Sequence, residues 1–595
     1  MKPNSLLFSF FLLALLLSCK VGSDQGNNGL YEMRDGQVIY SGDLSDAVSS
    51  HILADPSSLH PLNSELAVRY EILDMCFDRL MVFDIHTGNL IPQLAEAPPQ
   101  VSEDGLTYRF KIREEAAWAD GSPIVAEDVV FSTKLNLCPL VENQNLKPYL
   151  EYIKDIRADE ADPKTLIVEM KGFYINNDYF GVYSYVFDAR FYDPKGLIQA
   201  YTVAELQDPK SKAMEDEALI AWAEEFNGQA YGRSVDHLIS GSGPYVMTEW
   251  IPEQRIVLSR NEGYWGKNGT EYWQKQKPDQ IIYKIVREDN SAVLQFREEL
   301  LDVSTYLQPA TYLNLQADST VRMNYHMAIK PRTSFASLAL NNRPDGISHQ
   351  RFFEQAKVRK ALALAINRER LVEEVLDGMG TICVSPVPPS NLHFHKNLQP
   401  FPYDIQQAET LLNEAGWEDR DQNGIREKTI DGKTVEFSFS FLHPPGSPVV
   451  ERMAQFIQSE LSRVGIECKP EPSADYAQKV QNKDYDATML SLRASSLPYD
   501  FKQTFHSDNW PNGTNYFGYR NEEADRLMNE LRAEQDEARR KEIANRIQEI
   551  IYEDQPVVFL FNSVKKVILH KRFTGGTIFD VPGYVQLNQL EVVRE

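Results

Sequence analysis

Hydrophobic and polar positions alternate most regularly in residues 106–113 (LTYRFKIR), where a period of two predicts a half-buried strand. Turn-forming residues stand on both sides of this strand, at 102–105 (SEDG) and at 118–123 (WADGSP). Residues 126–132 (AEDVVFS) then predict the start of a helix, because two acidic residues lie in its first turn, where the helix dipole favours negative charge.

Helical spacing dominates residues 521–551, where apolar residues recur between many charged ones. The apolar positions of this stripe are Leu527, Leu531, Ile543, Ile547 and Ile550. The pattern predicts one or two amphipathic helices with one solvated face. Because strand-like and helix-like segments alternate along the whole chain, the expected fold class is mixed α/β.

The N-terminal segment predicts a secretion signal that ends in a lipid attachment site. Residues 6–17 (LLFSFFLLALLL) form an apolar run that is shorter than the roughly 20 residues of a membrane-spanning helix. The run leads into LLSC, which resembles a bacterial lipobox with Cys19 as the acylated residue. We therefore expect residues 1–18 to be a signal peptide and residues 19–36 to be a flexible, lipid-anchored tether.

The length and the net charge of the chain limit which architectures and which binding partners are possible. A chain of 595 residues is too long for one ordinary hydrophobic core, so we expect at least two lobes. Its formal net charge of -25 repels phosphate backbones and anionic lipid headgroups. This charge argues against a nucleic-acid partner, and it keeps a soluble surface from self-associating, so we expect a monomer.

Four cysteines follow Cys19, and their spacing matches neither a zinc pattern nor a Cys-x-x-Cys motif. They are Cys76, Cys138, Cys383 and Cys468. Disulfides are chemically permitted outside the cytoplasm. A pairing within each half of the chain and four buried free thiols both remain open.

Local motifs of the common enzyme classes do not occur in the sequence. It contains no His-Glu-x-x-His, no Gly-x-Ser-x-Gly, no phosphate-binding loop and no Gly-x-Gly-x-x-Gly. We therefore expect neither catalytic residues nor a cofactor, although a catalytic triad need not be local in sequence.

Residues 419–424 (DRDQNG) resemble the beginning of a calcium-binding loop. An EF-hand also needs a carboxylate at its twelfth position, which here is Ile430. We therefore interpret the segment as a solvated turn, with a weak calcium site as the minor alternative, and expect no metal site.

Five sequence motifs that contain turn-forming residues follow one another along the chain. They are LIPQLAEAPPQVSEDGLTYRFKIREEAAWADGSPIVAEDVVFS (90–132), GSGPY with NEGYWG (241–266), VRKAL with AINR (358–368), AETLLNEAGW (408–417) and Tyr485-Asp486 with 515–521. Together they resemble the peptide/nickel class of ABC-transporter solute-binding proteins, which is family 5 of the extracellular solute-binding proteins. The resemblance runs from about residue 37 to the C-terminus.

This resemblance implies a two-lobed, type II periplasmic-binding-protein fold with an extra subdomain on lobe I and a hinge between the lobes. Lobe I would comprise residues 37–335, lobe II residues 336–559, and residues 560–595 would return to lobe I. The hinge crossings would lie near 334–341 (SFASLALN) and 557–562 (VVFLFN), which are apolar and β-prone.

The resemblance also implies where a ligand would bind. Residues 55–61 (DPSSLHP) look like an extended stretch that pairs with a peptide backbone in the family, so Asp55 and Ser57 are candidate ligand-binding residues. The alternative is an ordinary Pro-rich loop.

A second candidate region follows the strand 485–492. Peptide-binding relatives have an Asp there that takes the peptide's α-ammonium, but the equivalent position in this chain is Ser495. Arg493 adds a positive charge nearby and would face a ligand carboxylate, or it makes a structural ion pair. Asp500 would replace the missing Asp if the loop runs differently; otherwise the ligand is anionic, N-blocked or not a peptide.

The resemblance therefore implies a lipoprotein in the periplasm or on the cell surface that captures a peptide-like solute and delivers it to an ABC permease with its ATPase complex. Three alternatives stay open. They are a sensory or regulatory binding lipoprotein on the same fold, a binder of a non-peptide solute and, last, a secreted hydrolase.

Overall fold

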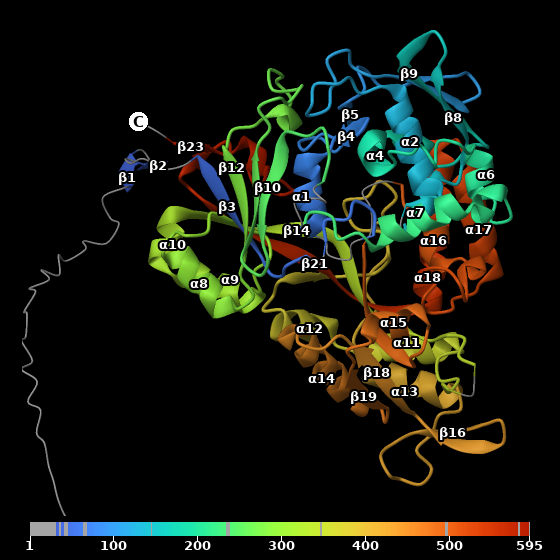
Figure 1. Ribbon diagram of the computed structural model, residues 1–595. Coiled ribbons are helices and arrows are strands. Elements are labelled where there is room, and N and C mark those ends of the chain that lie inside the picture. Colours follow the sequence, from blue (N-terminus) through green and yellow to red (C-terminus); the bar gives the residue numbers. More distant parts are fainter. Residues whose placement is uncertain are drawn as a thin grey trace, which may run out of the picture.

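The computed structural model describes residues 31–34, 37–40, 46–56, 58–63, 68–143, 146–233, 239–345, 348–493, 498–580 and 583–593. Within them, one sheet of eleven strands runs through the molecule in the order β10-β11-β12-β3-β13-β21-β14-β20-β18-β19, with β15 beside β21 (Figure 1). Its strands are β3 (Ala47–Ile52), β10 (Tyr245–Ile251), β11 (Arg255–Arg260), β12 (Gln280–Ile285), β13 (Val303–Ser304), β14 (Tyr325–Leu340), β15 (Gly380–Ile382), β18 (Ser438–His443), β19 (Glu467–Pro472), β20 (Ala487–Arg493) and β21 (Val557–His570).

The two ends of this sheet carry separate hydrophobic cores, which we call lobe I and lobe II. Lobe I packs its half of the sheet, β10 to β13, between two groups of helices. These helices are α1 (Val68–Cys76), α5 (Ala189–Tyr192), α7 (Glu217–Gly228), α8 (Asp289–Arg297), α9 (Pro309–Ala317) and α10 (Ser319–Asn324). The chain returns to lobe I at its end, where β22 (Phe573–Thr574) pairs with β23 (Glu591–Val592). A short hairpin, β1 (Tyr31–Arg34) with β2 (Gln37–Tyr40), precedes β3.

Lobe II is built on β20, β18 and β19, with helices on both faces. Along β14, Ala336 and Leu338 join one core while Phe335 and Ala339 join the other, as the alternation of a strand requires. The helices are α11 (Ala356–Ala365), α12 (Arg368–Val375), α13 (Ile405–Glu414), α14 (Pro448–Ser462), α15 (Tyr476–Gln481), α16 (Phe501–Phe505), α17 (Glu522–Ala533) and α18 (Glu537–Asp554). A hairpin of β16 (Glu427–Ile430) and β17 (Lys433–Glu436) extends from the far end of lobe II (Figure 1).

An extra subdomain attached to lobe I has its own four-stranded sheet, in the order β6-β7-β9-β8, and its own core. Its elements, with a neighbouring hairpin, are β4 (Met81–Phe83), β5 (Leu90–Pro92), β6 (Gln100–Val101), β7 (Thr107–Lys111), β8 (Ile153–Asp159), β9 (Asp162–Met170), α2 (Ala126–Leu137), α3 (Lys147–Leu150), α4 (Phe180–Tyr183) and α6 (Val203–Gln207). β7 lies within the predicted strand and alternates in burial, and α2 begins at the predicted residue. Both predictions are therefore confirmed.

Two long strands, β14 and β21, belong to both lobes. Residues 325–331 of β14 pair with 564–570 of β21 in lobe I, whereas residues 334–340 of β14 pair with β20 in lobe II. The pairing between β14 and β21 shifts register between Pro331 and Phe335, which marks the crossing. The expected lobe boundaries at 335/336 and 559/560 stay predictions.

The amphipathic pattern at 521–551 forms two helices, α17 and α18, whose apolar stripe is buried as predicted. Asn521 caps α17 by accepting a hydrogen bond from Ala524 N. The four cysteines after Cys19 are buried free thiols. Across the described residues, every helix is too short or too polar to cross a bilayer.

A buried ion pair joins three distant parts of lobe I. Arg572 donates to both carboxylate oxygens of Asp302 at 2.6 Å, and also to Ala47 O at 3.0 Å. Asp302 Oδ2 further accepts hydrogen bonds from the backbone N and the hydroxyl of Ser49. The charge of Asp302, which is 1 % exposed, is therefore balanced only when the C-terminal segment lies against β3.

We predict that Arg572→Met destabilises lobe I by about 3–5 kcal/mol, because it leaves the Asp302 carboxylate buried without its cation. Urea denaturation followed by circular dichroism measures the loss. Asp580→Asn is the control: it removes an ion pair with Lys330 in which Asp580 is 75 % exposed, and should cost less than about 1 kcal/mol. Equal stability of the two variants would contradict the structural role of Arg572.

Candidate ligand-binding cleft

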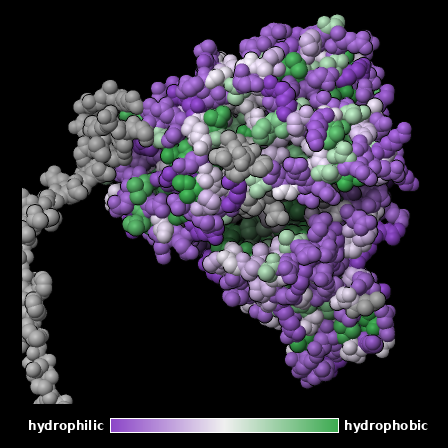
Figure 2. All heavy atoms as spheres, in the orientation of Figure 1, coloured by the Kyte–Doolittle hydropathy of each residue, from purple (hydrophilic) through white to green (hydrophobic). Residues whose placement is uncertain are grey.

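The crossing strands lie at the back of a hollow between the lobes. Figure 2 shows this recess, lined in part by hydrophobic residues, above α12 and beside α8 and α9 in the orientation of Figure 1. At the crossing, the hydroxyls of Ser334 and Ser563 hydrogen-bond at 2.7 Å. Buried side chains also meet near the crossing, since Met379, directly before β15, packs into the cluster that contains Ile568 of β21.

Asp55 lies in the loop after β3 and is held by the β10–β11 hairpin. Its carboxylate accepts hydrogen bonds from Trp250 Nε1 and Glu253 N, each at 2.9 Å, and lies 3.4 Å from Arg233 Nη2. The Arg233 guanidinium also stacks over the Trp250 ring at 4.5 Å. The side chain of Asp55 is 2 % exposed, so its carboxylate fixes the loop beside the cleft.

Of three further predicted site residues, the structure describes only the backbone of Arg493. Arg493 ends β20, and its backbone pairs with Ser334 at the crossing. Ser57 and Ser495 lie outside the described residues, as does Cys19. The structure thus brings the backbone of Arg493 to the crossing, and its role in ligand binding stays a prediction.

Asp500 lies at the contact between lobe II and the segment after β9. It caps α16 by accepting a hydrogen bond from Lys502 N, and it accepts another from the Tyr174 hydroxyl at 3.1 Å. Arg532 Nε of α17 lies 3.1 Å from Asp500 Oδ2 as an ion pair. The side chain of Asp500 is 2 % exposed, so a ligand ammonium at this carboxylate would have to compete with Arg532.

Two tyrosines complete this contact, which we call the lateral latch (Tyr152, Tyr174, Asp500 and Arg532). The rings of Tyr152 and Tyr174 stack at 4.3 Å, and the Arg532 guanidinium lies 4.9 Å from each ring centre. Ile175 N also donates to Arg532 O at 3.0 Å. The latch joins the extra subdomain directly to the helices of lobe II.

Positive charge gathers on the two strands at the crossing. Lys565 Nζ lies 4.3 Å above the Tyr306 ring, and the Tyr306 hydroxyl donates to Glu71 at 2.6 Å. Burial raises the pKa of Glu71, while the charges of Lys565 and Arg332 oppose that rise. Burial, with a smaller contribution from Arg332, lowers the pKa of Lys566 to about 8. A half-buried cation whose charged form is disfavoured is well suited to meet an anion.

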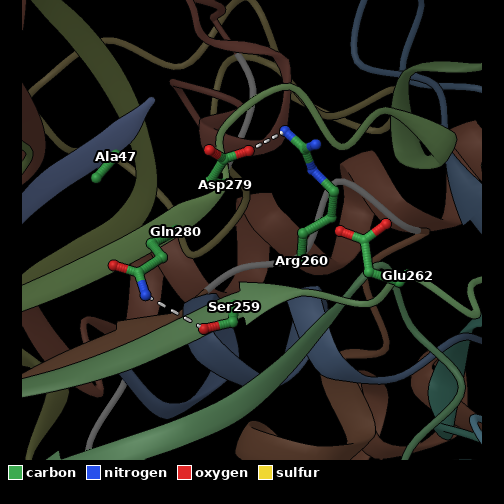
Figure 3. A pocket seen from close by; sticks show the side chains of 6 residues that line it. All are labelled: Ala47, Ser259, Arg260, Glu262, Asp279 and Gln280. Carbon is green, nitrogen blue, oxygen red and sulfur yellow. Dashed lines mark hydrogen bonds and ion pairs between the residues drawn. The ribbon is translucent and has the colours of Figure 1, made fainter. Parts of the chain in front are cut away.

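A separate depression of about 350 Å³ lies at the other end of β3 (Figure 3). It is lined by Ala47, Ser259, Arg260, Glu262, Asp279 and Gln280, with Arg260 and Asp279 paired at 2.7 Å. Because Ala47 begins β3 and the Asp55 loop follows its end, the two places are separated by about 16 Å of strand. This depression is therefore distinct from the cleft.

Sequence reasoning missed Arg532, Tyr174, Glu71 and Lys565. Arg532 lies in α17, whose charged residues the helical pattern predicts to face solvent. The Lys565-Lys566 pair, directly after a β-prone run at an expected hinge, was the one available signal for charge at the crossing.

Comparison with known proteins agrees with this architecture. The sequence model of the bacterial extracellular solute-binding proteins, family 5 (middle), matches residues 89–513. The chain is 28 % identical over 558 residues to the oligopeptide-binding protein AppA of Bacillus subtilis (strain 168), covering 92 % of this chain and 91 % of that protein. It is 24 % identical over 529 residues to heme-binding protein A of Haemophilus influenzae (strain Rd), covering 86 % and 84 %.

The solved structure of Bacillus subtilis AppA in complex with a nonapeptide matches with a TM-score of 0.73 at 24 % identity, covering 92 % of this chain and 98 % of that one. This similarity confirms the expected fold class, a two-lobed α/β binding-protein fold.

We predict that Asp500→Asn loosens the lateral latch, because asparagine still caps α16 while Arg532 loses its buried carboxylate partner. Small-angle X-ray scattering of the ligand-free protein should give a larger radius of gyration than the wild type, with a lower melting temperature. Asp508→Asn, at a residue 71 % exposed, is the matched control and should change neither. If both variants scatter and melt like the wild type, the latch does not hold the lobes together.

Proposed function

The chain belongs to the bacterial extracellular solute-binding proteins of family 5, and from this premise we propose that it captures a peptide-like solute between its lobes and delivers it to an ABC importer. The observation that carries the proposal is the hollow between two lobes, through both of which β14 and β21 run. Rotation about these strands would enclose the solute and create the surface that docks on a permease coupled to its ATPase.

We place an acidic group of the solute at the crossing. Lys566 and Arg332 supply positive charge there, and Arg493 ends β20 beside Ser334. Lys565 is the neighbour of Lys566 in β21, so its side chain stands on the opposite face of the sheet, over the Tyr306 ring. A carboxylate buried on closure needs such cations, since an unpaired buried charge is costly. In a peptide this group would be a C-terminal or side-chain carboxylate.

The loop at Asp55 and Ser57 would contribute the opposite wall of the cleft, with backbone groups for an extended ligand. Asp55 acts there by fixing the loop through Trp250. Ser495 carries no charge for an α-ammonium, and Asp500 would serve only if the ligand displaced Arg532. These two residues favour a solute whose recognition does not depend on a free amino terminus.

We further propose that lipid on Cys19 holds the protein at a bacterial membrane, on its periplasmic or outer side, through the tether 19–36. The folded part would act as a monomer. Its role is binding without turnover, and no residue is assigned to catalysis.

A second candidate is a binder of a non-peptide solute on the same fold. The engagement of Asp500 by Arg532 favours it, because the described carboxylate nearest in sequence to Ser495 is already neutralised. One relative is named for heme rather than for a peptide, so the family accommodates such ligands.

We predict that native mass spectrometry of the lipid-free chain, residues 20–595, releases a ladder of short peptides on partial denaturation. Release of a single non-peptide solute would support solute capture but would contradict the assignment of the solute as a peptide. Hydrolysed peptide products would point instead to a hydrolase, and a protein that releases and binds nothing would contradict solute capture altogether.

The role of Arg493 is tested on the released ligand by calorimetry. Arg493→Gln should weaken binding at least about tenfold, as expected for loss of a charge-assisted contact. Arg520→Gln, at an arginine that is 63 % exposed, is the control and should bind as the wild type does. Equal affinity of Arg493→Gln would place the acidic group elsewhere.

The pKa of Lys566 gives the proposal a pH dependence. A pKa of about 8 means that Lys566 is a cation below pH 8, and an anionic ligand raises its pKa in the complex. We predict that affinity is constant below pH 7 and falls by up to about tenfold per pH unit as the pH rises above 8. Calorimetry between pH 6 and pH 9.5 measures it.

Lys566→Gln should lower the affinity at pH 7 and remove the fall above pH 8. Lys469→Gln, at a lysine that is 59 % exposed, should retain both the affinity and its pH dependence. A fall above pH 8 that persists in Lys566→Gln would assign it to another group.

A further inference from the structure

An acidic loop joins α13 to β16 at the far end of lobe II, away from the cleft (Figure 1). It comprises residues 419–427 (DRDQNGIRE). One carboxylate oxygen each of Asp419, Asp421 and Glu427 lies within 4.8 Å of the others. Asp419 and Asp421 are exposed, whereas Glu427 is 6 % exposed.

The buried carboxylate is only half satisfied. Glu427 Oε1 accepts a hydrogen bond from Arg420 N at 2.9 Å, but Glu427 Oε2 is buried without a hydrogen-bond partner. Buried polar atoms almost always have a partner, and an orphaned carboxylate oxygen is among the costliest exceptions. Exposed acidic clusters are common, but a buried oxygen of this kind calls for a cation.

The nearby arginines do not supply that cation. Arg426 directs its guanidinium to the carbonyls of Val464 and Trp417 and to Asn413 Oδ1. Arg420 pairs through Nε with Glu418 at 3.1 Å. Lys428, which directly follows Glu427 in the chain, donates its ammonium to Ala415 O at 2.8 Å. All three of these cations are therefore committed elsewhere.

The loop backbone is already shaped around the three carboxylates. Gly424 adopts a φ of +89°, and its N donates to Asp419 Oδ2 at 3.1 Å. Asp421 accepts from Asn423 N, and Ile425 N donates to Asn423 Oδ1. Residues 418 and 427 form an antiparallel bridge, so the two ends of the loop are held together.

We propose that this loop binds a calcium ion through Asp419, Asp421 and Glu427. All of the converging groups are carboxylate oxygens, which suit a hard cation, and calcium tolerates irregular coordination that magnesium does not. The carboxylate that closes the site is the ninth residue of the loop, where an EF-hand has it at the twelfth. Bound calcium would hold the loop after α13 against the start of β16 independently of any solute in the cleft.

The test is calorimetric titration of the chelator-treated full chain with CaCl2. We expect one site with a dissociation constant in the range of about 0.1–1 mM, as for other extracellular calcium modules. The melting temperature should rise with CaCl2 and return to its original value with EDTA. A wild-type protein without saturable binding up to about 10 mM CaCl2 would overturn the proposal.

Glu427→Gln should weaken calcium binding at least about tenfold, because the number of charged ligands sets the affinity. The glutamine keeps an acceptor for Arg420 N, so the variant should fold, with a melting temperature in EDTA no lower than that of the wild type. Asp431→Asn, at an exposed residue in the turn of the same hairpin, is the control and should bind calcium as the wild type does. Unchanged affinity in Glu427→Gln would refute the assignment of the site.

Discussion

The hydrogen-bonded pairing of β14 with β21 is the constraint on which the rest of the structure depends. Both strands continue through both lobes, so each lobe takes its central strands from the same two segments. The largest hydrophobic core of each lobe is separate from that of the other, and smaller shared contacts, such as Tyr174 packed among residues of lobe II, lie outside the crossing. The ladder between the two strands shifts register twice, after Pro331 and again between Ala336 and Ser337, and the first shift lies at the crossing.

Charged side chains lie at two places where the lobes meet, the crossing and the lateral latch. At the crossing, Lys565 and Lys566 carry positive charge on opposite faces of β21. At the lateral latch, Asp500 and Arg532 already satisfy each other, and the stacked tyrosines shield the pair. The latch is therefore an attraction between the extra subdomain and lobe II that needs no ligand.

Local patterns were sufficient for much of the fold. The alternation at 106–113 and the stripe at 521–551 depend only on neighbours in sequence, and both formed as predicted. The partners of individual side chains could not be predicted from neighbours in sequence. Asp500 and Arg532, for example, meet only because α17 packs on lobe II. The position of Glu427 was missed for a related reason, since the fixed spacing of an EF-hand does not describe a loop closed by a β-bridge.

The last long strand of the chain lies in the middle of the sheet, and this placement orders the assembly of the molecule. β21 separates β13 from β14, and Arg572, directly after it, reaches back across 525 residues to Ala47. Neither half of the sheet is complete until the segment through Arg572 has been synthesised. Lobe I therefore stays incomplete until β21 has been synthesised. A chain that stops before residue 557 lacks the central strand of both lobes at once.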